Sequence, residues 1–500
     1  MRHILALDQG TSSSRAVVYD EHGEVVAQAQ QTFDLIFPAQ GWVELDPEVI
    51  WQTTVACAKE VLSSLPDASL VTGLGITNQR ETTIVWDRQT GACIYNAIVW
   101  QDSRTEPDCE VFRKLKFAGQ PLATLVSEQT GLVIDPYFSS TKLKWILDNV
   151  GGARDRAERG ELCFGTVDSF LIWRLTGGAV HATDATNASR TQLFDIQRQE
   201  WSSELIAAFE IPFSVLPEVK DCVADYGSTT SEVLGVTIPI LGVAGDQQAA
   251  LIGQGCFESG QTKSTYGTGC FVIVNTGSEL VRSTHKLLST VGYRLNGETT
   301  YALEGSIFIA GAGVKWLQDG LGLISDVQDT ERAFVETGGD SGGVYFVPAL
   351  VGLGAPYWQP NATGLITGLT LDSTKAQVVT ALLQAIVFQT EELLRAMAHD
   401  GARIGELRID GGMVVNDSLC QFLADILNID VLRPSRVETT VFGAAVLAGI
   451  GAGLYADLPQ AAQAWRLERK FSPKFDDQKR KTLTEGYQLA VRQVLTTVTQ

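Results

Sequence analysis

A single carboxylate follows the apolar run at residues 241–245, in the stretch LGVAGDQQAALIGQG. Asp246 stands where this strand-like run ends and a helical pattern of small residues begins, so we expect it at the mouth of a strand-to-helix turn. A carboxylate held there can take a proton from a substrate hydroxyl. The alternative is that Asp246 caps the helix that follows, because aspartate is a favoured cap.

Three glycine-rich turns also follow strand-like runs: Asp8-Gln9-Gly10-Thr11-Ser12-Ser13, Tyr266-Gly267-Thr268-Gly269 and Asp410-Gly411-Gly412. Backbone N–H groups exposed in such turns can hold phosphate oxygens, because glycine lets the chain approach closely. Each turn alone is more often an ordinary turn. The three together favour a phosphate site. The chain has no GxxxxGK[ST] and no GxGxxG after a strand, so a nucleotide would lie between two hairpins rather than on one phosphate loop.

Arg80 and Glu81 adjoin in ITNQRETTIVW, between two apolar, β-branched runs that we expect to be buried. Adjacent charges usually mark a solvated turn, but a buried pair could exchange hydrogen bonds with a polyol. Trp100, Tyr137 and Phe271 lie at strand ends, where each is either a core aromatic or a ligand contact.

Composition narrows the class of protein. At 500 residues the chain exceeds what one hydrophobic core usually supports, which predicts two domains with a cleft between them. The net charge, 38 − 58 = −20, and the lack of a basic patch argue against nucleic-acid and membrane partners. The eight cysteines and five histidines show no metal-ligand spacing. They favour free thiols in a reducing compartment, and Cys270 is expected to be inert. We find no signal peptide or membrane-spanning run and predict a cytoplasmic protein.

The order of strand and helix signals supports two related halves. The N-terminus predicts two successive hairpins, followed by a helix from Pro47 to about Ser64. The second half repeats the strand, glycine turn and strand, and adds a long helix closed by Gly401. We place the division at Gly255, giving domains 1–254 and 255–500, the latter with a helical tail. Asp246 would then lie at the domain interface.

Several stretches together resemble the FGGY family of carbohydrate kinases, and within it the members that phosphorylate glycerol. The resemblance rests on ALDQGTSSSRAVVYD, GITNQRETTIVW, YNAIVWQDSRT, TGLVIDPYFSSTKLKWIL, ELCFGTVDSFLIWRLTGG, TDATNASRTQLFDI, GVAGDQQAALIGQG, YGTGCF, GLGAPYW and DGGMVVN, and runs from residue 4 to about residue 470. It implies an α/β fold of the sugar kinase, actin and heat-shock ATPase type (ribonuclease H-like), with two domains on mixed sheets closing over ATP and substrate.

The resemblance also implies roles. Asp246 matches the general base that deprotonates a terminal hydroxyl, and Asp8 matches the residue that holds Mg²⁺. The residues implied to bind glycerol are Arg80, Glu81, Trp100, Tyr137, Asp246, Gln247 and Phe271. Those implied to bind ATP are Thr11, Ser12, Ser13, Arg15, Thr268, Gly311, Lys315, Gly412 and Asn416.

The chain departs from its relatives in two places. Lys315 stands where some relatives have glutamine, which leaves its nucleotide contact open. Residues 226–240 contain neither the histidine phosphorylated in some relatives nor the Gly-Lys-Gly-Gly loop that binds fructose bisphosphate in others, so we expect neither control. The sequence does not give the oligomeric state, and a homodimer and a homotetramer are both open.

Two rival functions remain. One is a kinase of the same family acting on xylulose, gluconate or ribulose, although those relatives lack the NQRETT stretch. The other is a nucleotide-binding protein without catalysis, which would have no use for Asp246 beside the Arg80-Glu81 pair.

Overall fold

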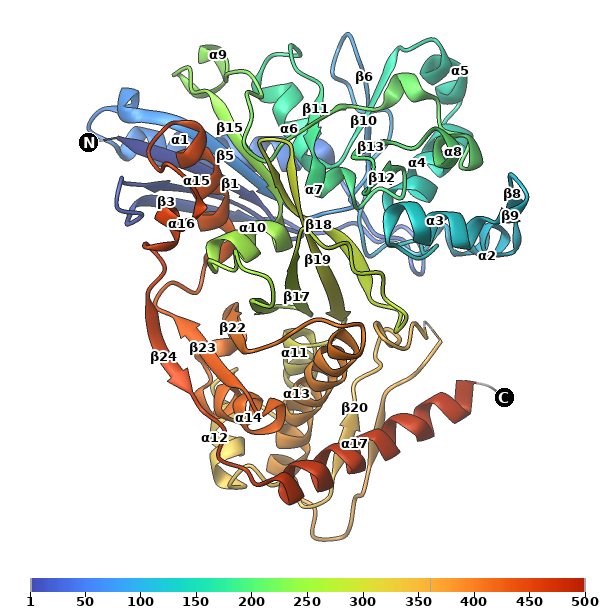
Figure 1. Cartoon of the computed structure of the whole chain (residues 1–500), viewed down its shortest axis with the longest axis vertical. Helices are drawn as coiled ribbons and strands as arrows, with labels where there is room; N and C mark the ends of the chain where they lie inside the picture. Colours follow the sequence, from blue (N-terminus) through green and yellow to red (C-terminus); the bar gives the residue numbers. More distant parts are fainter. Residues whose placement is uncertain (1, 360, 499–500) are drawn as a thin grey trace.

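The computed structural model describes residues 2–359 and 361–498 (Figure 1). Each half of the chain supplies one large mixed sheet. The first sheet has the order β15 (Ile240–Gly245), β5 (Val71–Asn78), β1 (His3–Gln9), β2 (Ser13–Tyr19) and β3 (Val25–Thr32). The first three of these strands are parallel, while β2 and β3 continue as antiparallel hairpins to the edge, as predicted.

The second sheet repeats this arrangement and adds a strand at each edge. Its order is β18 (Leu288–Leu295), β19 (Glu298–Ile307), β17 (Cys270–Gly277), β16 (Thr262–Tyr266), β22 (Glu406–Asp410), β23 (Asp430–Pro434) and β24 (Leu467–Phe471). Here β23, β22 and β16 are parallel, and β17 and β19 follow as antiparallel neighbours. The carboxyl ends of the corresponding strands β1 and β16 therefore carry the first two predicted glycine turns.

Two predicted helices form as expected. α1 (Pro47–Ser64) begins after Asp46, whose carboxylate accepts a hydrogen bond from the Glu48 amide at 2.9 Å. α13 (Lys375–His399) begins with a capping box in which Thr374 and Gln377 satisfy each other's backbone amides. The buried face of α13 forms much of the second core.

One helix does not stay with its own half of the sequence. α15 (Thr439–Gly451) packs against β15, β5 and β1 of the first sheet and crosses α10 (Asp246–Gly253), as Figure 1 shows. A Cβ atom at Gly443 would lie 1.8 Å from the Ala249 carbonyl oxygen, so the two backbones touch directly. The division at residue 255 remains a prediction, and α15 belongs spatially with the first sheet.

The remaining elements surround these sheets. In the first half they are β4 (Glu44–Leu45), β6 (Ile84–Asp87), β7 (Ala97–Ile98), α2 (Glu106–Lys114), β8 (Lys116–Phe117), β9 (Gln120–Pro121), α3 (Leu122–Thr130), α4 (Ser139–Asn149), α5 (Ala153–Glu158), β10 (Leu162–Gly165), α6 (Val167–Leu175), β11 (Ala182–Asp184), α7 (Ala185–Ala188), β12 (Phe194–Asp195), β13 (Glu200–Trp201), α8 (Ser203–Ala208), β14 (Glu218–Lys220) and α9 (Ser231–Leu234). In the second half they are α11 (Gly311–Asp319), α12 (Asp329–Glu336), β20 (Tyr345–Val347), β21 (Leu365–Thr367), α14 (Asp417–Leu427), α16 (Leu458–Ala462) and α17 (Asp477–Val498).

The cysteines are all free, as predicted, and all except Cys93 are buried. Burial raises the pKa of the Cys270 thiol to about 12, which agrees with an inert side chain. Within residues 2–359 and 361–498, no helix combines the length and the apolar character needed to cross a bilayer.

Candidate active site

A small cavity lies where the carboxyl ends of β1, β5 and β15 meet the turn between β16 and β17. Its volume is about 170 Å³. The structure brings all seven predicted glycerol residues to its wall: Arg80, Glu81, Trp100, Tyr137, Asp246, Gln247 and Phe271. The wall is completed by Thr11, Thr265, Gly267, Thr268 and Gly269. Residues from both halves of the chain therefore enclose one space.

Three aromatic rings form the apolar part of this wall. The Trp100 ring meets Tyr137 edge-on, with centroids 5.6 Å apart, and Phe271 at 6.3 Å. Trp100 Nε1 donates to Thr11 Oγ1 at 3.0 Å, which fixes the indole plane. The rings leave the Tyr137 hydroxyl without a hydrogen bond from any described residue, so it is available to a ligand in the cavity.

Asp246 is the first residue of α10 and keeps a partly exposed carboxylate. Arg80 Nε lies 3.1 Å from Asp246 Oδ1, and this oxygen also accepts the Gln247 amide at 2.7 Å. Burial raises the pKa of Asp246, while Arg80 and Lys263 oppose that rise. The carboxylate is thus partly dehydrated yet held in a fixed direction, which suits a general base.

Asp8 is the last residue but one of β1 and lies in a different environment. Burial raises its pKa to about 7, opposed by Arg15 and reinforced by the charges of Asp246 and Glu438. No described residue hydrogen-bonds its carboxylate. A buried carboxylate without a donor, whose pKa is raised further by neighbouring carboxylates, fits a cation beside it.

A magnesium ion suits this donor set. Within the described part of the chain, no three histidine, cysteine, aspartate or glutamate side chains gather into a metal cluster. Mg²⁺ commonly takes one or two protein carboxylates and completes its shell with water and substrate phosphates, so the Asp8 carboxylate fits such an ion. The role of Asp8 in holding Mg²⁺ remains a prediction.

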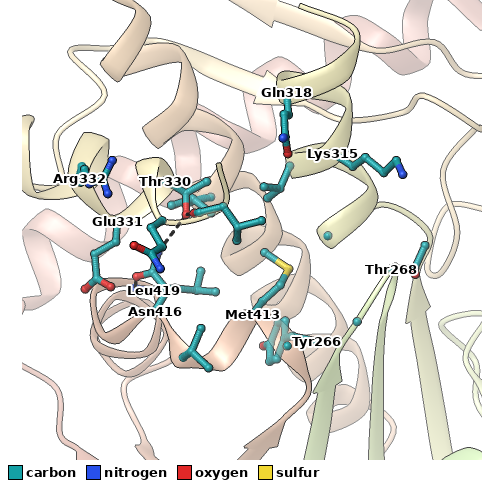
Figure 2. Close-up of a pocket in the computed structure, with 18 of the residues that line it drawn as sticks. Tyr266, Thr268, Lys315, Gln318, Thr330, Glu331, Arg332, Met413, Asn416 and Leu419 are labelled. Carbon is teal, nitrogen blue, oxygen red and sulfur yellow. Dashed lines mark hydrogen bonds between the residues drawn. The ribbon is translucent and has the colours of Figure 1, made fainter. Parts of the chain in front are cut away.

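A larger pocket of about 920 Å³ adjoins the cavity (Figure 2). The predicted nucleotide residues Thr268, Gly311, Lys315, Gly412 and Asn416 all line it. Apolar side chains supply further wall, including Val314, Leu383, Met413 and Leu419. Polar and charged side chains share the wall with them, among them Gln318, Thr330 and Asn416. A pocket of this size with a mixed wall can hold a nucleotide-sized ligand.

Within this pocket, Figure 2 shows the Asn416 amide directed at Thr330 Oγ1, at 3.4 Å. The Lys315 side chain is 80% exposed and approaches Asp319 at 3.8 Å. It lines the pocket without being fixed, so its nucleotide contact remains a prediction.

The remaining predicted phosphate residues occupy the β1–β2 hairpin. Thr11 lines the small cavity, whereas Ser12, Ser13 and Arg15 are not among the residues that line either space. The Arg15 guanidinium pairs with Glu438 and donates to Gln30 Oε1 at 3.0 Å. Phosphate binding by these three residues remains a prediction.

Three charged residues beside the cavity were not predicted: Arg190, Lys263 and Glu304. All three are completely buried. Lys263 donates to Gln247 Oε1 and, at 2.9 Å, to Thr265 Oγ1. Glu304 is a single carboxylate within the apolar run YALEGSIFI, and that isolation is the signal that could have revealed it.

Two related mixed sheets with joined cavities at their facing strand ends define the two-domain sugar kinase fold, so the predicted fold class is confirmed. The chain belongs to the FGGY family of carbohydrate kinases. The model of the family's N-terminal domain matches residues 3–253, and that of its C-terminal domain matches residues 262–452.

Individual relatives agree with this assignment. The chain is 56% identical to glycerol kinase 1 of Pseudomonas aeruginosa over 493 residues, covering 98% of this chain and 99% of that protein. The glycerol kinase of Alcanivorax borkumensis is 55% identical, with 99% of each covered. The crystal structure of Plasmodium falciparum glycerol kinase with ADP superposes with a TM-score of 0.91 at 37% identity, covering 99% and 98% of the two chains. Xylulose kinase from Lactobacillus acidophilus, at 20% identity, shares the fold, with a TM-score of 0.87 and 99% of each chain covered.

Proposed function

We propose that the protein transfers the γ-phosphoryl group of ATP to a terminal hydroxyl of glycerol, giving glycerol 3-phosphate as the first step of glycerol catabolism. The observation that carries this proposal is the junction of the two spaces. Gly267 and Thr268 line both the 170 Å³ cavity and the 920 Å³ pocket. A nucleotide in the larger pocket would therefore present its terminal phosphate to a small polyol in the cavity.

Asp246 accepts the proton of the attacking hydroxyl. Its general-base contribution is about 10²–10⁴-fold, so most of the acceleration comes from positioning and charge neutralisation of a loose transition state. Thr11 and Thr268 hold phosphate oxygens at the junction. Asp8 would hold Mg²⁺, and the ion would supply charge neutralisation to the phosphates.

Glycerol is favoured as the substrate because the cavity is small and every predicted contact is polar or aromatic. Arg80 donates, Glu81 accepts, and the Tyr137 hydroxyl does either. A site that pairs each hydroxyl rejects analogues that lack one, since its own buried groups would stay unpaired. The close similarity to glycerol kinases supports the same choice over xylulose, gluconate or ribulose.

ATP as phosphoryl donor and eight free cysteines favour work in the cytoplasm.

The test is ADP release by the purified protein with saturating ATP and Mg²⁺, with and without glycerol. We expect release to depend on glycerol and to be much slower with xylulose, ribulose or gluconate. Equal ADP release in the presence and absence of every polyol would reject the kinase and favour the nucleotide-binding alternative.

A further inference from the structure

Five charged side chains beside the small cavity are linked by consecutive ion pairs. Arg80 forms a fork with Glu304, with Nη1–Oε2 at 2.6 Å and Nη2–Oε1 at 2.9 Å. Glu304 Oε1 also accepts from Arg190 Nη2 at 3.1 Å, and Arg190 Nε donates to Glu81 Oε1 at 2.7 Å. Together with the Arg80–Asp246 contact, these ion pairs form one network in the order Asp246, Arg80, Glu304, Arg190 and Glu81.

The members of this network differ in whether they line the cavity. Asp246, Arg80 and Glu81 line the cavity, whereas Glu304 and Arg190 do not and are completely buried. Glu304 also comes from β19 of the second sheet, while the other four residues belong to the first half. A buried ion pair that touches no ligand costs desolvation free energy, so its geometry calls for a function.

The geometry of Arg80 supplies that function. Both terminal nitrogens donate to Glu304, Nη1 also donates to Gln248 Oε1 at 3.2 Å, and Nε is the nitrogen directed at Asp246. One N–H of Nη2 has no partner among the described residues and is available to a polyol. A free guanidinium would prefer to face a carboxylate with two parallel N–H groups. Such a fork on Asp246 would occupy the oxygens that must accept the substrate proton.

We propose that Glu304 is a positioning residue that holds the Arg80 fork away from Asp246 and thereby keeps Asp246 available as the base. This inference rests on the proposed function of Asp246. Arg190 donates to the same Glu304 oxygen as Arg80 Nη2 and links it to Glu81. The Glu304 carboxylate therefore positions the groups that contact both Asp246 and Glu81.

The charges around both carboxylates agree with this role. Burial alone would raise the pKa of Glu304, but Arg190 and Arg80 outweigh it and hold the pKa at about 2, so Glu304 stays ionised. The groups that act on Asp246 are Arg80, Lys263, Glu304 and the Gln247 amide, and Asp246 in turn raises the pKa of Asp8. Among these, Glu304 raises the pKa of Asp246, whereas Arg80 and Lys263 lower it.

The test compares Glu304→Gln and Glu304→Asp by measuring kcat against pH at saturating glycerol, ATP and Mg²⁺. Saturating Mg²⁺ keeps Asp8 from contributing to the acid limb. In Glu304→Gln, Arg80 loses its anionic partner and turns to Asp246. We expect kcat to fall at least about tenfold and the acid limb to move to lower pH by about one to two units. Glu304→Asp keeps the charge but has a shorter side chain. The acid limb of its pH profile should therefore lie between those of the wild type and Glu304→Gln.

Glu392→Gln is the matched control. Glu392 is also a buried glutamate, on α13, where it accepts the Tyr357 hydroxyl at 2.6 Å and lines neither cavity. It should retain the wild-type pH profile even if its melting temperature falls. ADP binding checks that each variant is folded, and Glu304→Asp serves if Glu304→Gln does not fold.

A folded Glu304 variant with the wild-type kcat and acid limb would overturn the proposal. So would a fall in kcat without any movement of the limb in Glu304→Gln, because a merely structural role predicts that result. Asp246→Asn distinguishes failure of the proposed function from failure of the positioning role of Glu304. If this variant retains its kcat, the proposed function fails. If it is inactive while both Glu304 variants behave normally, only the positioning role fails.

Discussion

Asp246 and Asp8 are both aspartates at strand ends, and burial raises the pKa of each, yet their partners differ. Asp246 is fixed by Arg80 and by the Gln247 amide, so it presents a directed oxygen to the cavity. Asp8 has no donor among the described residues and faces the charges of Arg15 and Glu438. The first arrangement suits proton transfer, and the second suits a cation.

Substituting Asp246→Asn tests the base at the scale of one residue. Asparagine keeps the size of the side chain but cannot accept the proton, so kcat should fall about 10²–10⁴-fold. Glycerol and nucleotide should still bind, as titration calorimetry would measure. If Asp246 served only to stabilise the start of α10, asparagine would replace it with little change in kcat.

Asp8→Asn should change the response to Mg²⁺ rather than the binding of glycerol. Loss of the anchoring carboxylate raises the Mg²⁺ concentration needed for half-maximal activity, because waters and phosphates alone must then hold the ion. A magnesium titration of ADP release measures this shift. An unchanged half-maximal concentration would assign the cation to another residue.

The same substitution should alter stability in a pH-dependent way when a chelator removes divalent cations. The pKa of Asp8 rises from 3.8 to about 7 in the folded protein, so the unfolded chain ionises first. Folding stability contributed by this group is therefore lost as pH rises from about 4 to about 7. Asp8→Asn should melt above wild type at about pH 8 and lose that advantage near pH 4. Parallel melting curves at all pH values would contradict the raised pKa.

At the scale of elements, the helices α10 and α15 come from different halves of the sequence and are in direct backbone contact at Ala249 and Gly443. From helix propensity alone, Gly443→Ala should stabilise α15 by about 1 kcal/mol. The added methyl group would overlap the Ala249 carbonyl oxygen, at 1.8 Å, so the helices must separate. We expect a net destabilisation of about 2 kcal/mol, seen as a lower melting temperature.

Gly405→Ala is the control for this substitution, because nothing lies within 4 Å of a Cβ atom at that exposed site. Its melting temperature should stay close to that of wild type. Equal effects of the two substitutions would show that the close approach of α10 and α15 does not limit stability.

Local structural elements could be predicted from the sequence more reliably than the elements against which they pack. The start of α1 after Asp46 and the glycine turns at strand ends are specified by short stretches and were predicted, whereas the Thr374–Gln377 capping box of α13 was not. The packing of α15 on the first sheet was not predicted, because small residues predict a close approach without identifying the partner. Glu304 and Arg190 were missed for a related reason. Each is one charge without a local motif, and only tertiary contact brings it beside Arg80.

At the scale of the whole molecule, the cavity joins residues far apart in the chain. Thr11, Arg80 and Asp246 come from one half, and Thr265 and Phe271 from the other. A ligand that contacts both halves stabilises the folded state by mass action, since it does not bind the unfolded chain. Glycerol at about 100 times its dissociation constant should add about 2.7 kcal/mol and raise the melting temperature.

Tyr137→Phe shows whether that stabilisation comes from the predicted site. No described residue hydrogen-bonds the Tyr137 hydroxyl, so its removal should leave the melting temperature of the ligand-free protein nearly unchanged. Glycerol should bind more weakly by about 1 kcal/mol, the net value of a typical hydrogen bond, and its thermal shift at fixed concentration should shrink. The shift caused by ADP should not, because Tyr137 does not line the larger pocket. An equal glycerol shift in wild type and Tyr137→Phe would place the polyol elsewhere, whereas loss of both shifts would mean that the substitution disturbs the junction as a whole.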